Sequence, residues 1–208
     1  MFVFVFVASD KNIIFITGNE YKYEQAKEAL KETDIKLIRQ DIDTPEIQST
    51  KVEDIASYSS KWASTKLNQP VVLTDAGYYF EALNGFPGPF IKYINQWFTA
   101  QDYLNLMAGK TNRRVIITQC LSYCEPGQDP VNFLGSVEGT IANYVGSIGK
   151  WKTPINQVYI PQGYDKVVGE LPFEEMMKDW NSDTVWSQFV EYLSNHSTSS
   201  GNNRISPS

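Results

Sequence analysis

IIFITGNEYK, residues 13–22, is the stretch that decides the fold of this chain. Its four leading apolar residues, three of them β-branched, predict a short buried strand. Thr17-Gly18-Asn19 then turns the chain, and residues 20–33 have the composition of a helix. A small turn between a strand and a helix points backbone N–H groups outward, which suits a bound phosphate. Lys22 lies in the first turn of that helix, within reach of such an anion.

This junction alone is not specific, because strand–turn–helix junctions occur throughout α/β proteins. The stretch also lacks the Gly and Lys-Ser/Thr spacing of a P-loop. Whether the turn binds phosphate therefore depends on what the rest of the chain places beside it.

Length and composition limit the class of protein. The 208 residues suit one large domain or two closely joined lobes. The net charge of −6 excludes a general binder of nucleic acid or of membrane surfaces, which needs a basic surface. Cys120 and Cys124 lie in a strand-like run, where extended backbone separates them by roughly 13 Å, too far for a disulfide. A reducing, cytoplasmic location is therefore expected.

The two ends of the chain differ from its middle. The apolar run 2–7 lacks a basic leader, is short for a signal peptide and is far too short to span a membrane. It predicts either an extra edge strand or a disordered start. Residues 194–208 are rich in Ser and Asn and predict a disordered tail. The expected organisation is an N-terminal extension (1–11), one domain (12–193) and the tail (194–208).

Between these ends, strand and helix patterns alternate and then give way to a hairpin turning near Pro126-Gly127. The pattern predicts an α/β fold with a mixed sheet. Predicted strands cover 13–16, 35–38, 70–75, 114–123, 132–141 and 158–160. Predicted helices cover 20–33, 52–67, 90–98, 101–109, 173–178 and 184–193.

Four segments carry more specific expectations. The strand 70–75 is expected to stop at Ala76-Gly77, with 78–83 a further strand or a connector. Residues 41–48 form a loop rich in acceptors, and 143–157 another loop. Residues 84–89, NGFPGP, form a stiff double turn. In the helix 90–98 the residues Phe90, Ile94 and Trp97 are expected to face inward, and Lys92, Asn95 and Gln96 outward.

The residue types available restrict the chemistry to carboxylates. The one histidine, His196, lies in the predicted tail, which excludes a Ser-His-Asp triad, a Cys-His pair and a His-rich zinc site. Asp75 ends a predicted strand, and ligands of α/β sheets gather beyond such ends, where the Thr17 turn also lies. The alternative for Asp75 is a helix cap or a turn acceptor.

Two further residues extend this possible site. Glu46, in the loop Thr44-Pro45-Glu46, would give with Asp75 the two carboxylates that Mg²⁺ takes from a protein when phosphates and waters complete its shell. A lone loop Glu is otherwise simply solvated. Lys92, after the Gly-Pro turn, either supplies a fixed positive charge for a phosphate or lies on the polar face of its helix.

In this order the motifs resemble the inosine triphosphate pyrophosphatase family, the hydrolases of non-canonical purine nucleoside triphosphates. The resemblance runs from about residue 12 to residue 193. The motifs that carry it are ITGNxxK (16–22), TPE (44–46), LTD (73–75) and, most specifically, ALNGFPGPFIK (82–92), with FxGxVxGxI (133–141) and PxGY (161–164) as later landmarks.

The resemblance implies an elongated, mixed-sheet, two-lobed α/β fold with the nucleotide in a central cleft, and a homodimer. It implies hydrolysis of a nucleoside triphosphate to the monophosphate and pyrophosphate with Mg²⁺, Mn²⁺ being an alternative ion. Metal and carboxylate chemistry fit that reaction. Carried over by position, Thr17, Gly18, Asn19 and Lys22 would hold the phosphates, Glu46 and Asp75 the metal, Asp75 would also be the base, and Lys92 would contact the triphosphate.

The chain also departs from the family. Thr74 replaces an acidic residue and Ala76 a Ser or Thr, while an expected lysine aligns near Tyr58-Ser59, with Lys61 displaced from it. The base-reading Phe-Gly-Trp-Asp segment falls at 153–156, where Asn156 is the remaining polar candidate and Trp151 lies nearby. The Ser-His-Arg motif falls near 180–182, where His and Arg are both missing.

Two hypotheses follow from this contrast. The first is an Mg²⁺-dependent nucleoside triphosphate pyrophosphatase whose base specificity is altered or relaxed, since losing charged hydrogen bonds to a base costs a few kcal/mol. The second is a catalytically impaired homologue that binds a nucleotide or a protein partner. The retained carboxylates and lysines favour the enzyme.

Overall fold

The computed structural model describes residues 11–150, 152–172, 174–175 and 185–197. Their strands are β1 (Lys11–Ile16), β2 (Ile35–Gln40), β3 (Val71–Phe80), β4 (Pro87–Gly88), β5 (Arg114–Cys124), β6 (Val131–Ile141) and β7 (Tyr159–Pro161). Their α-helices include α1 (Glu20–Leu30), α2 (Val52–Leu67), α3 (Ile91–Trp97), α4 (Ala100–Leu106) and α6 (Val185–Ser197). Short 3₁₀ helices are η1 (Glu81–Leu83), η2 (Pro154–Gln157) and η3 (Val168–Glu170).

The strands form one mixed sheet in the order β2-β1-β3-β5-β6-β7, with β4 paired to β3. β1 is parallel to both β2 and β3, whereas β3, β5, β6 and β7 are antiparallel to their neighbours. The mixed α/β fold predicted from the sequence is therefore confirmed. Two parallel crossovers, through α1 and α2, precede the hairpin of β5 and β6, as the alternating patterns indicate.

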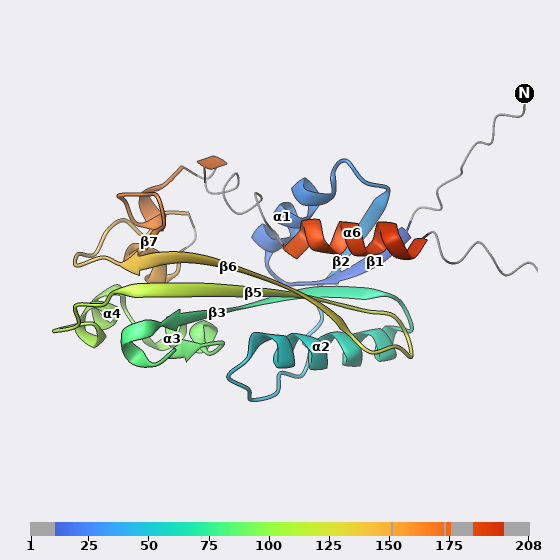
Figure 1. Cartoon of the computed structure of the whole chain (residues 1–208), viewed down its shortest axis with the longest axis horizontal. Helices are drawn as coiled ribbons and strands as arrows, with labels where there is room; N and C mark the ends of the chain where they lie inside the picture. Colours follow the sequence, from blue (N-terminus) through green and yellow to red (C-terminus); the bar gives the residue numbers. More distant parts are fainter. Residues whose placement is uncertain (1–10, 151, 173, 176–184, 198–208) are drawn as a thin grey trace, which may run out of the picture.

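Three long strands, β3, β5 and β6, join two lobes along the length of the molecule (Figure 1). In one lobe α1 and α6 cover one face of the sheet and α2 covers the other. In the other lobe α3, α4, η2 and β7 surround a separate core that contains Phe80, Tyr103 and Tyr159. The elongated, two-lobed shape thus follows from strands long enough to serve two cores.

The core beneath α1 and α6 is built largely from aromatic rings. Phe15 of β1 meets the edge of Trp186 at a centroid distance of 5.4 Å. Phe189, fully buried, packs against Tyr123 at 5.2 Å and Phe133 at 5.8 Å. Edge-to-face contacts of this kind add about 0.5–1.5 kcal/mol per pair to the burial of the rings. α6 is therefore fixed to the sheet by its own aromatic side chains.

β3 is longer than the sequence predicts, because it continues through Ala76-Gly77 to Phe80. β5 pairs with it without interruption, from Val71 opposite Cys124 to Phe80 opposite Val115. A Cβ at Gly77 would lie 2.8 Å from the ring of Tyr79, so the glycine makes room for that ring within the strand. The prediction that Asp75 ends the strand is consequently wrong, and Asp75 lies in its middle.

The orientation of α3 also differs in part from the prediction. Ile94 is buried as expected, but Trp97 is 71% exposed and Phe90 37% exposed. The buried face of this seven-residue helix is formed by Ile91 and Ile94, three positions apart, which leaves Trp97 on the outside. The inward placement of Phe90 and Trp97 is therefore wrong.

The C-terminal boundary shifts by four residues. α6 runs to Ser197, so residues 194–197 are helical and the predicted start of the tail is wrong. His196 stacks on Tyr192 at a centroid distance of 4.1 Å, and its Nδ1 lies 2.8 Å from the Tyr192 carbonyl oxygen. These contacts stabilise a last helical turn whose composition is polar. The remaining tail, the run 2–7 and most of the predicted helix 173–178 lie outside the described residues.

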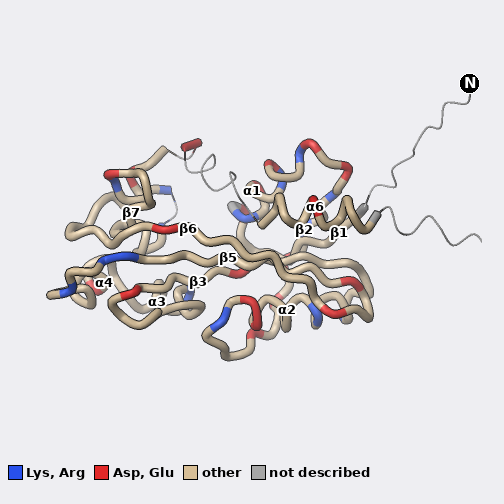
Figure 2. The backbone as a smooth tube through the Cα atoms, viewed as in Figure 1, with Lys and Arg blue, Asp and Glu red and all other residues tan. Residues whose placement is uncertain are grey.

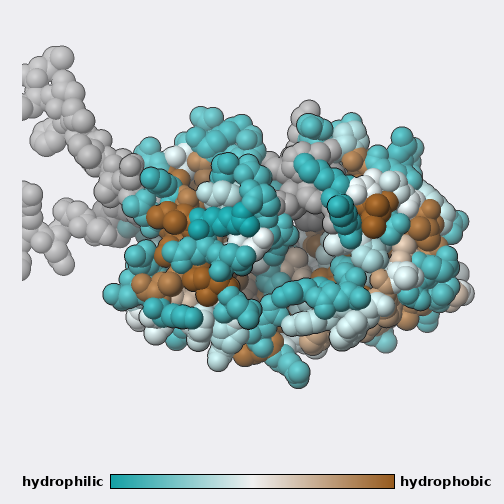
Figure 3. Space-filling view, turned by 180° about the vertical axis from the view of Figure 1, so that it is seen from behind, coloured by the Kyte–Doolittle hydropathy of each residue, from teal (hydrophilic) through white to brown (hydrophobic). Residues whose placement is uncertain are grey.

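The surface agrees with the expectations from composition. Lys and Arg are interspersed with Asp and Glu over the described residues (Figure 2). On the face seen in Figure 3, apolar side chains form small groups separated by hydrophilic ones. None of the helices in the described ranges is both long and apolar enough to cross a bilayer. Cys120 and Cys124 are both free, as predicted, and both are buried.

The packing of α6 gives a stability prediction. Phe189→Ala removes a fully buried ring from the aromatic core, and we expect the free energy of unfolding to fall by about 3–5 kcal/mol. Trp97→Ala is the control, because a side chain that is mostly exposed should change the free energy of unfolding by less than about 0.5 kcal/mol. Urea denaturation followed by circular dichroism measures both. Equal losses in the two variants would contradict this packing.

Candidate active site

The site lies where the sheet has a gap in its pairing. β1 pairs with β3 only at Val71 and Val72, and β4 pairs with it only at Tyr78 and Tyr79. Between these points, in the described part of the chain, no strand pairs with this edge of β3. Asp75 lies in the gap, just past the level at which β1 ends. The proximity of Asp75 to the Thr17 turn is therefore as predicted, although its cause is the end of β1 and not an end of β3.

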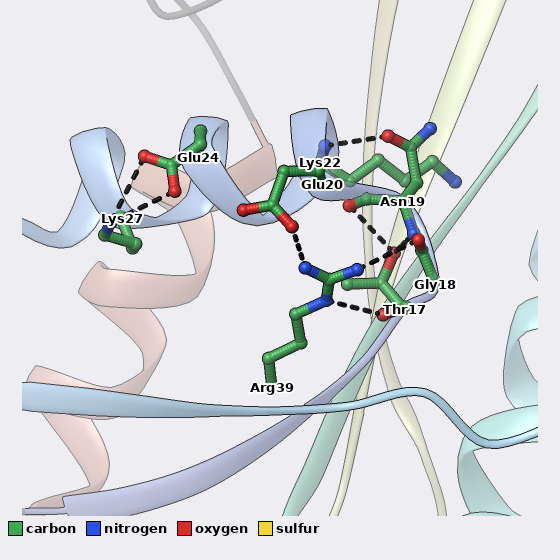
Figure 4. A network of polar contacts seen from close by, with 8 residues as sticks. All are labelled: Thr17, Gly18, Asn19, Glu20, Lys22, Glu24, Lys27 and Arg39. Carbon is green, nitrogen blue, oxygen red and sulfur yellow. Dashed lines mark hydrogen bonds and ion pairs between the residues drawn. The ribbon is translucent and has the colours of Figure 1, made fainter.

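The turn after β1 is organised by its own side chains. The hydroxyl of Thr17 accepts a hydrogen bond from the Asn19 N–H at 3.1 Å. The side-chain oxygen of Asn19 in turn accepts from the Lys22 N–H at 3.4 Å, in the first turn of α1 (Figure 4). A Cβ on Gly18 would lie 2.8 Å from an Asp41 carboxylate oxygen, so only glycine fits there without displacing Asp41. The turn is thereby held open at the start of the helix.

Arg39 of β2 binds the outside of the same turn. Its Nε donates to the Thr17 carbonyl at 3.1 Å, and one terminal nitrogen donates to the Gly18 carbonyl at 3.0 Å. The other terminal nitrogen pairs with Glu20 (Figure 4). Because the guanidinium takes up two turn carbonyls, the turn is fixed with those carbonyls directed toward Arg39.

Lys22 leaves α1 toward the gap in the sheet. Its ammonium donates to the Thr74 carbonyl on β3 at 2.8 Å. Burial lowers the pKa of this ammonium, and the nearby carboxylates of Asp75 and Glu46 oppose that effect. A buried cation that already has one backbone partner is well placed to bind an anion in the cavity.

Asp75 faces the same cavity. Burial raises the pKa of its carboxyl group, while Lys22 and the Ala76 N–H, which donates to Oδ1 at 2.8 Å, oppose that rise. A carboxylate with a raised pKa is a better proton acceptor than an exposed one. Beside it, the hydroxyl of Thr74 is buried without a hydrogen-bond partner among the described residues.

Glu46 and Lys92 form an ion pair at the wall of the cavity. Lys92 Nζ lies 3.1 Å from Glu46 Oε1, and the hydroxyl of Tyr93 donates to Oε2 at 3.1 Å. Hydrogen bonding and the charge of Glu46 raise the pKa of Lys92 despite the opposing effect of burial. Lys92 therefore stays charged on the same side of the site as the Glu46 carboxylate.

These residues enclose one cavity of about 620 Å³. All of the predicted site residues except Asn156 line it. The residues that carry polar or charged groups into it include Thr17, Gly18, Asn19, Lys22, Asp41, Asp43, Glu46, Ser59, Thr74, Asp75, Tyr78 and Lys92. The two lysines and four carboxylates give it both the cations that bind phosphate and the anions that bind a metal.

Asn156 is not among the residues that line this cavity. It lies in η2 at the other lobe, and its N–H donates to the Thr153 carbonyl at 3.1 Å. Trp151 and residues 180–182, where the remaining base-reading positions fall, lie outside the described residues. The structure thus brings together the phosphate and metal positions, and it leaves Asn156 apart from them.

Several residues of the site were not singled out from the sequence. Ser59 lines the cavity from α2, where the resemblance leads one to expect a lysine, and its hydroxyl donates to the Pro45 carbonyl at 3.1 Å. Lys61 does not replace that lysine, because its ammonium pairs with Asp129 at 2.6 Å away from the cavity. The only sequence feature that pointed to Asp41 was its place in the acceptor-rich loop 41–48. No sequence feature pointed to Arg39 or Tyr93.

The carboxylates of the cavity suit a cation that is already coordinated by phosphate oxygens and water molecules. No group of three or more His, Cys, Asp or Glu side chains forms a metal cage within the described ranges. Asp75 and Glu46 act on one another electrostatically across the cavity. Two carboxylates are what Mg²⁺ commonly takes from a protein when phosphates and waters complete its shell. The donor set therefore suits a metal–phosphate complex better than a resident ion.

Comparisons with known proteins show which family of sequences and structures this chain resembles. The model of the Ham1 family matches residues 13–179. A dITP/XTP pyrophosphatase of Methanopyrus kandleri is 38% identical over 185 residues, which cover 88% of this chain and 97% of that protein. A dITP/XTP pyrophosphatase of Methanosarcina mazei is also 38% identical, over 188 residues, with 87% and 96% coverage.

Solved structures show the same fold. The Ham1 protein of Coxiella burnetii superposes with a TM-score of 0.72 at 22% identity, covering 91% of this chain and 99% of that one. The Ham1 protein of Staphylococcus aureus gives a TM-score of 0.70 at 24% identity, covering 91% and 100%. The elongated two-lobed sheet is thus shared well beyond close sequence similarity.

The hold of Arg39 on the turn gives a binding prediction. Arg39→Met keeps much of the side-chain length but removes the donors to the Thr17 and Gly18 carbonyls, so the turn should loosen. We expect the affinity for inorganic tripolyphosphate, measured by calorimetry, to fall about fivefold, from roughly 1 kcal/mol of lost preorganisation.

Lys27→Met is the matched control, because on the exposed side of α1 it removes the pair with Glu24 and a contact over the Tyr23 ring, and no bond to the turn (Figure 4). Its tripolyphosphate affinity should equal that of the unmodified protein. An Arg39→Met variant that binds as tightly as this control would show that the turn needs no such support.

Proposed function

Because the chain belongs to the Ham1 family, we propose that it is a nucleoside triphosphate pyrophosphatase, which releases a nucleoside monophosphate and pyrophosphate. The resemblance to the inosine triphosphate pyrophosphatase family seen in the sequence is confirmed by this membership. The observation that carries the function is the convergence of Lys22, Asp75, Glu46 and Lys92 on one cavity. Phosphate-binding cations and metal-binding carboxylates meet there from four separate segments of the chain.

In this proposal the triphosphate binds between the turn after β1 and the start of α3. The start of α1 presents the positive end of its helix to the phosphate oxygens, and Lys22 and Lys92 supply two further positive charges. Lys22 gives up part of its contact with the Thr74 carbonyl to bind a phosphate oxygen. The cations also stabilise the charge that develops on the departing pyrophosphate.

Asp75 is proposed as the general base. It accepts a proton from a water molecule that attacks the α-phosphorus, and the oxygen bridging the α- and β-phosphorus leaves with pyrophosphate. Burial raises its pKa toward the range of an effective base. The Ala76 N–H, bonded to Oδ1, fixes the direction of the carboxylate.

Glu46 and Asp75 are the proposed ligands of Mg²⁺, with Mn²⁺ as an alternative ion. When bound, the ion would neutralise phosphate charge and act as a Lewis acid. The support for this assignment is that Glu46 and Asp75 are two of the four carboxylates that line the cavity, together with the requirement of Mg²⁺ for few protein ligands.

The similar proteins and the sequence together suggest which bases to test first. The similar archaeal proteins are named dITP/XTP pyrophosphatases, so dITP and XTP are the first substrates to test. Asn156 remains the proposed base contact, and the missing His and Arg near 180–182 predict altered or relaxed discrimination.

We also propose that the protein is a cytoplasmic homodimer. The resemblance to the family supports the dimer, and the free, buried Cys120 and Cys124 support a reducing compartment. Sedimentation velocity on the purified chain tests the dimer, and a monomer at micromolar concentration would reject it.

The function is tested by incubating the purified protein with Mg²⁺ and each of dITP, XTP, ITP, dATP, ATP, GTP and UTP, and by assaying pyrophosphate. Release of pyrophosphate with the matching monophosphate supports the enzyme. Nucleotide binding without turnover of any substrate would instead support the catalytically impaired homologue. Release of single phosphate groups would indicate a different hydrolase.

The role of the base gives a kinetic prediction. Asp75→Asn keeps the size of the side chain but removes its ability to accept a proton, so kcat should fall about 10²–10⁴-fold. The Michaelis constant for the nucleotide should change far less than kcat. Stopped-time pyrophosphate assays over a range of substrate measure both, and an Asp75→Asn variant with undiminished turnover would reject Asp75 as the base.

Removal of the metal gives a second prediction, because the described residues form no all-protein metal cage. We expect EDTA to abolish turnover and to leave the melting temperature of the protein without nucleotide unchanged to within about 1 °C, since a metal that contributes no binding to the folded chain adds no stability. Differential scanning calorimetry with and without EDTA tests this. A clear drop in melting temperature would indicate a resident structural metal.

A further inference from the structure

Glu46 is held by two consecutive residues of α3. Lys92 Nζ contacts one carboxylate oxygen at 3.1 Å, and the hydroxyl of Tyr93 donates to the other at 3.1 Å. Because Glu46 belongs to the loop between β2 and α2, these two contacts join that loop to α3 across 46 and 47 positions of sequence. The direction of the carboxylate is therefore set by α3 more than by its own loop.

The Tyr93 ring is itself constrained. It packs against Trp97, one helical turn later, at a centroid distance of 6.2 Å and an interplanar angle of 31°. The ammonium of Lys92 lies 5.8 Å from the centroid of the same ring. Tyr93 is 38% exposed and lies at the molecular surface. Contacts with Trp97 and Lys92 restrict the ring, so its hydroxyl is directed toward Glu46 with less loss of side-chain entropy.

The two donors differ in what they can do when substrate binds. Lys92 is charged and mobile, and the proposed function assigns it to the triphosphate, so its contact with Glu46 competes with the phosphate oxygens. Tyr93 is a neutral donor, which occupies one lone pair of the carboxylate and leaves its negative charge available to a cation. Hydrogen bonds of this kind commonly orient carboxylates that bind metals.

We propose that Tyr93 is a positioning residue, which holds Glu46 in its metal-binding direction while Lys92 moves from Glu46 to the triphosphate. This inference rests on the proposed function, because it assigns Glu46 to the metal and Lys92 to the phosphates. It adds to the proposed metal site a residue that hydrogen-bonds to a ligand without binding the metal. It also explains the exposed pair Tyr93–Trp97, because Trp97 packs against the ring that orients Glu46.

The test is Tyr93→Phe, which removes the hydroxyl and keeps the ring between Trp97 and Lys92. Tyr79→Phe is the matched control, because the Tyr79 hydroxyl donates to the Thr50 carbonyl at 3.3 Å and makes no contact with Glu46. Binding of Mn²⁺ is measured by electron paramagnetic resonance with inorganic tripolyphosphate present. The Mg²⁺ concentration that gives half-maximal turnover is measured in parallel.

We expect Tyr93→Phe to weaken Mn²⁺ binding about tenfold, to raise the half-maximal Mg²⁺ concentration by a similar factor, and to recover most of kcat at saturating Mg²⁺. Tyr79→Phe should leave Mn²⁺ binding unchanged. In a Glu46→Gln background the change Tyr93→Phe should have no further effect on Mn²⁺ binding, because the carboxylate that it orients is missing.

Equal Mn²⁺ binding by Tyr93→Phe and Tyr79→Phe would overturn the inference, as would unaltered Mn²⁺ binding by Glu46→Gln. A loss of kcat that saturating Mg²⁺ does not restore would also overturn it, since Tyr93 would then act beyond the metal. Failure of the proposed function is separate and is seen as absence of turnover by the unmodified protein, whereas the Mn²⁺ measurement needs no turnover.

Discussion

The end of β1 at Ile16, while β3 continues to Phe80, is the constraint on which the rest of the site depends. β1 covers the edge of β3 only as far as Val72, and β4 covers it again only from Tyr78. The edge between them has backbone groups that need partners other than a strand. Lys22 supplies one by donating to the Thr74 carbonyl, so the same feature that opens the cavity draws a cation into it.

β3 can keep this gap on one edge because its other edge is paired without interruption. β5 pairs with β3 at every position from Val71 to Phe80, and β6 pairs with β5 over nearly its whole length. The long antiparallel ladder carries the stability, and a core is attached to it on either side of the gap. The cleft between two lobes is thus a consequence of one short parallel strand beside three long antiparallel ones.

Much of the fold could be predicted from the sequence, namely those elements that residue type alone determines. The buried run of β1, the turn at Thr17-Gly18-Asn19 and the mixed sheet follow from apolar patterns and small turn residues. The extent of β3 could not be predicted, because a glycine such as Gly77 normally indicates the end of a strand. Here the ring of Tyr79 fills the space that a side chain at Gly77 would need, and the strand continues. The outward position of Trp97 depends on which face of a short helix Ile91 and Ile94 bury, and local spacing permits both faces.

The contacts missed from the sequence are those that join distant segments, namely Arg39 to the turn and Tyr93 to Glu46. Such contacts show how the site balances its charges. Lys22 is buried close to Asp75, and the more exposed Lys92 is paired with Glu46, so each of these four charges has an opposite charge nearby. A triphosphate with its metal carries both kinds of charge: its oxygens suit the two lysines, and its cation suits the two carboxylates. In the proposed function, binding of that complex would exchange one set of ion pairs for another, whereas a phosphate without a metal would compensate the two lysines and leave the two carboxylates without a cation. The paired arrangement is thus an argument for the proposed metal–triphosphate complex over either component alone.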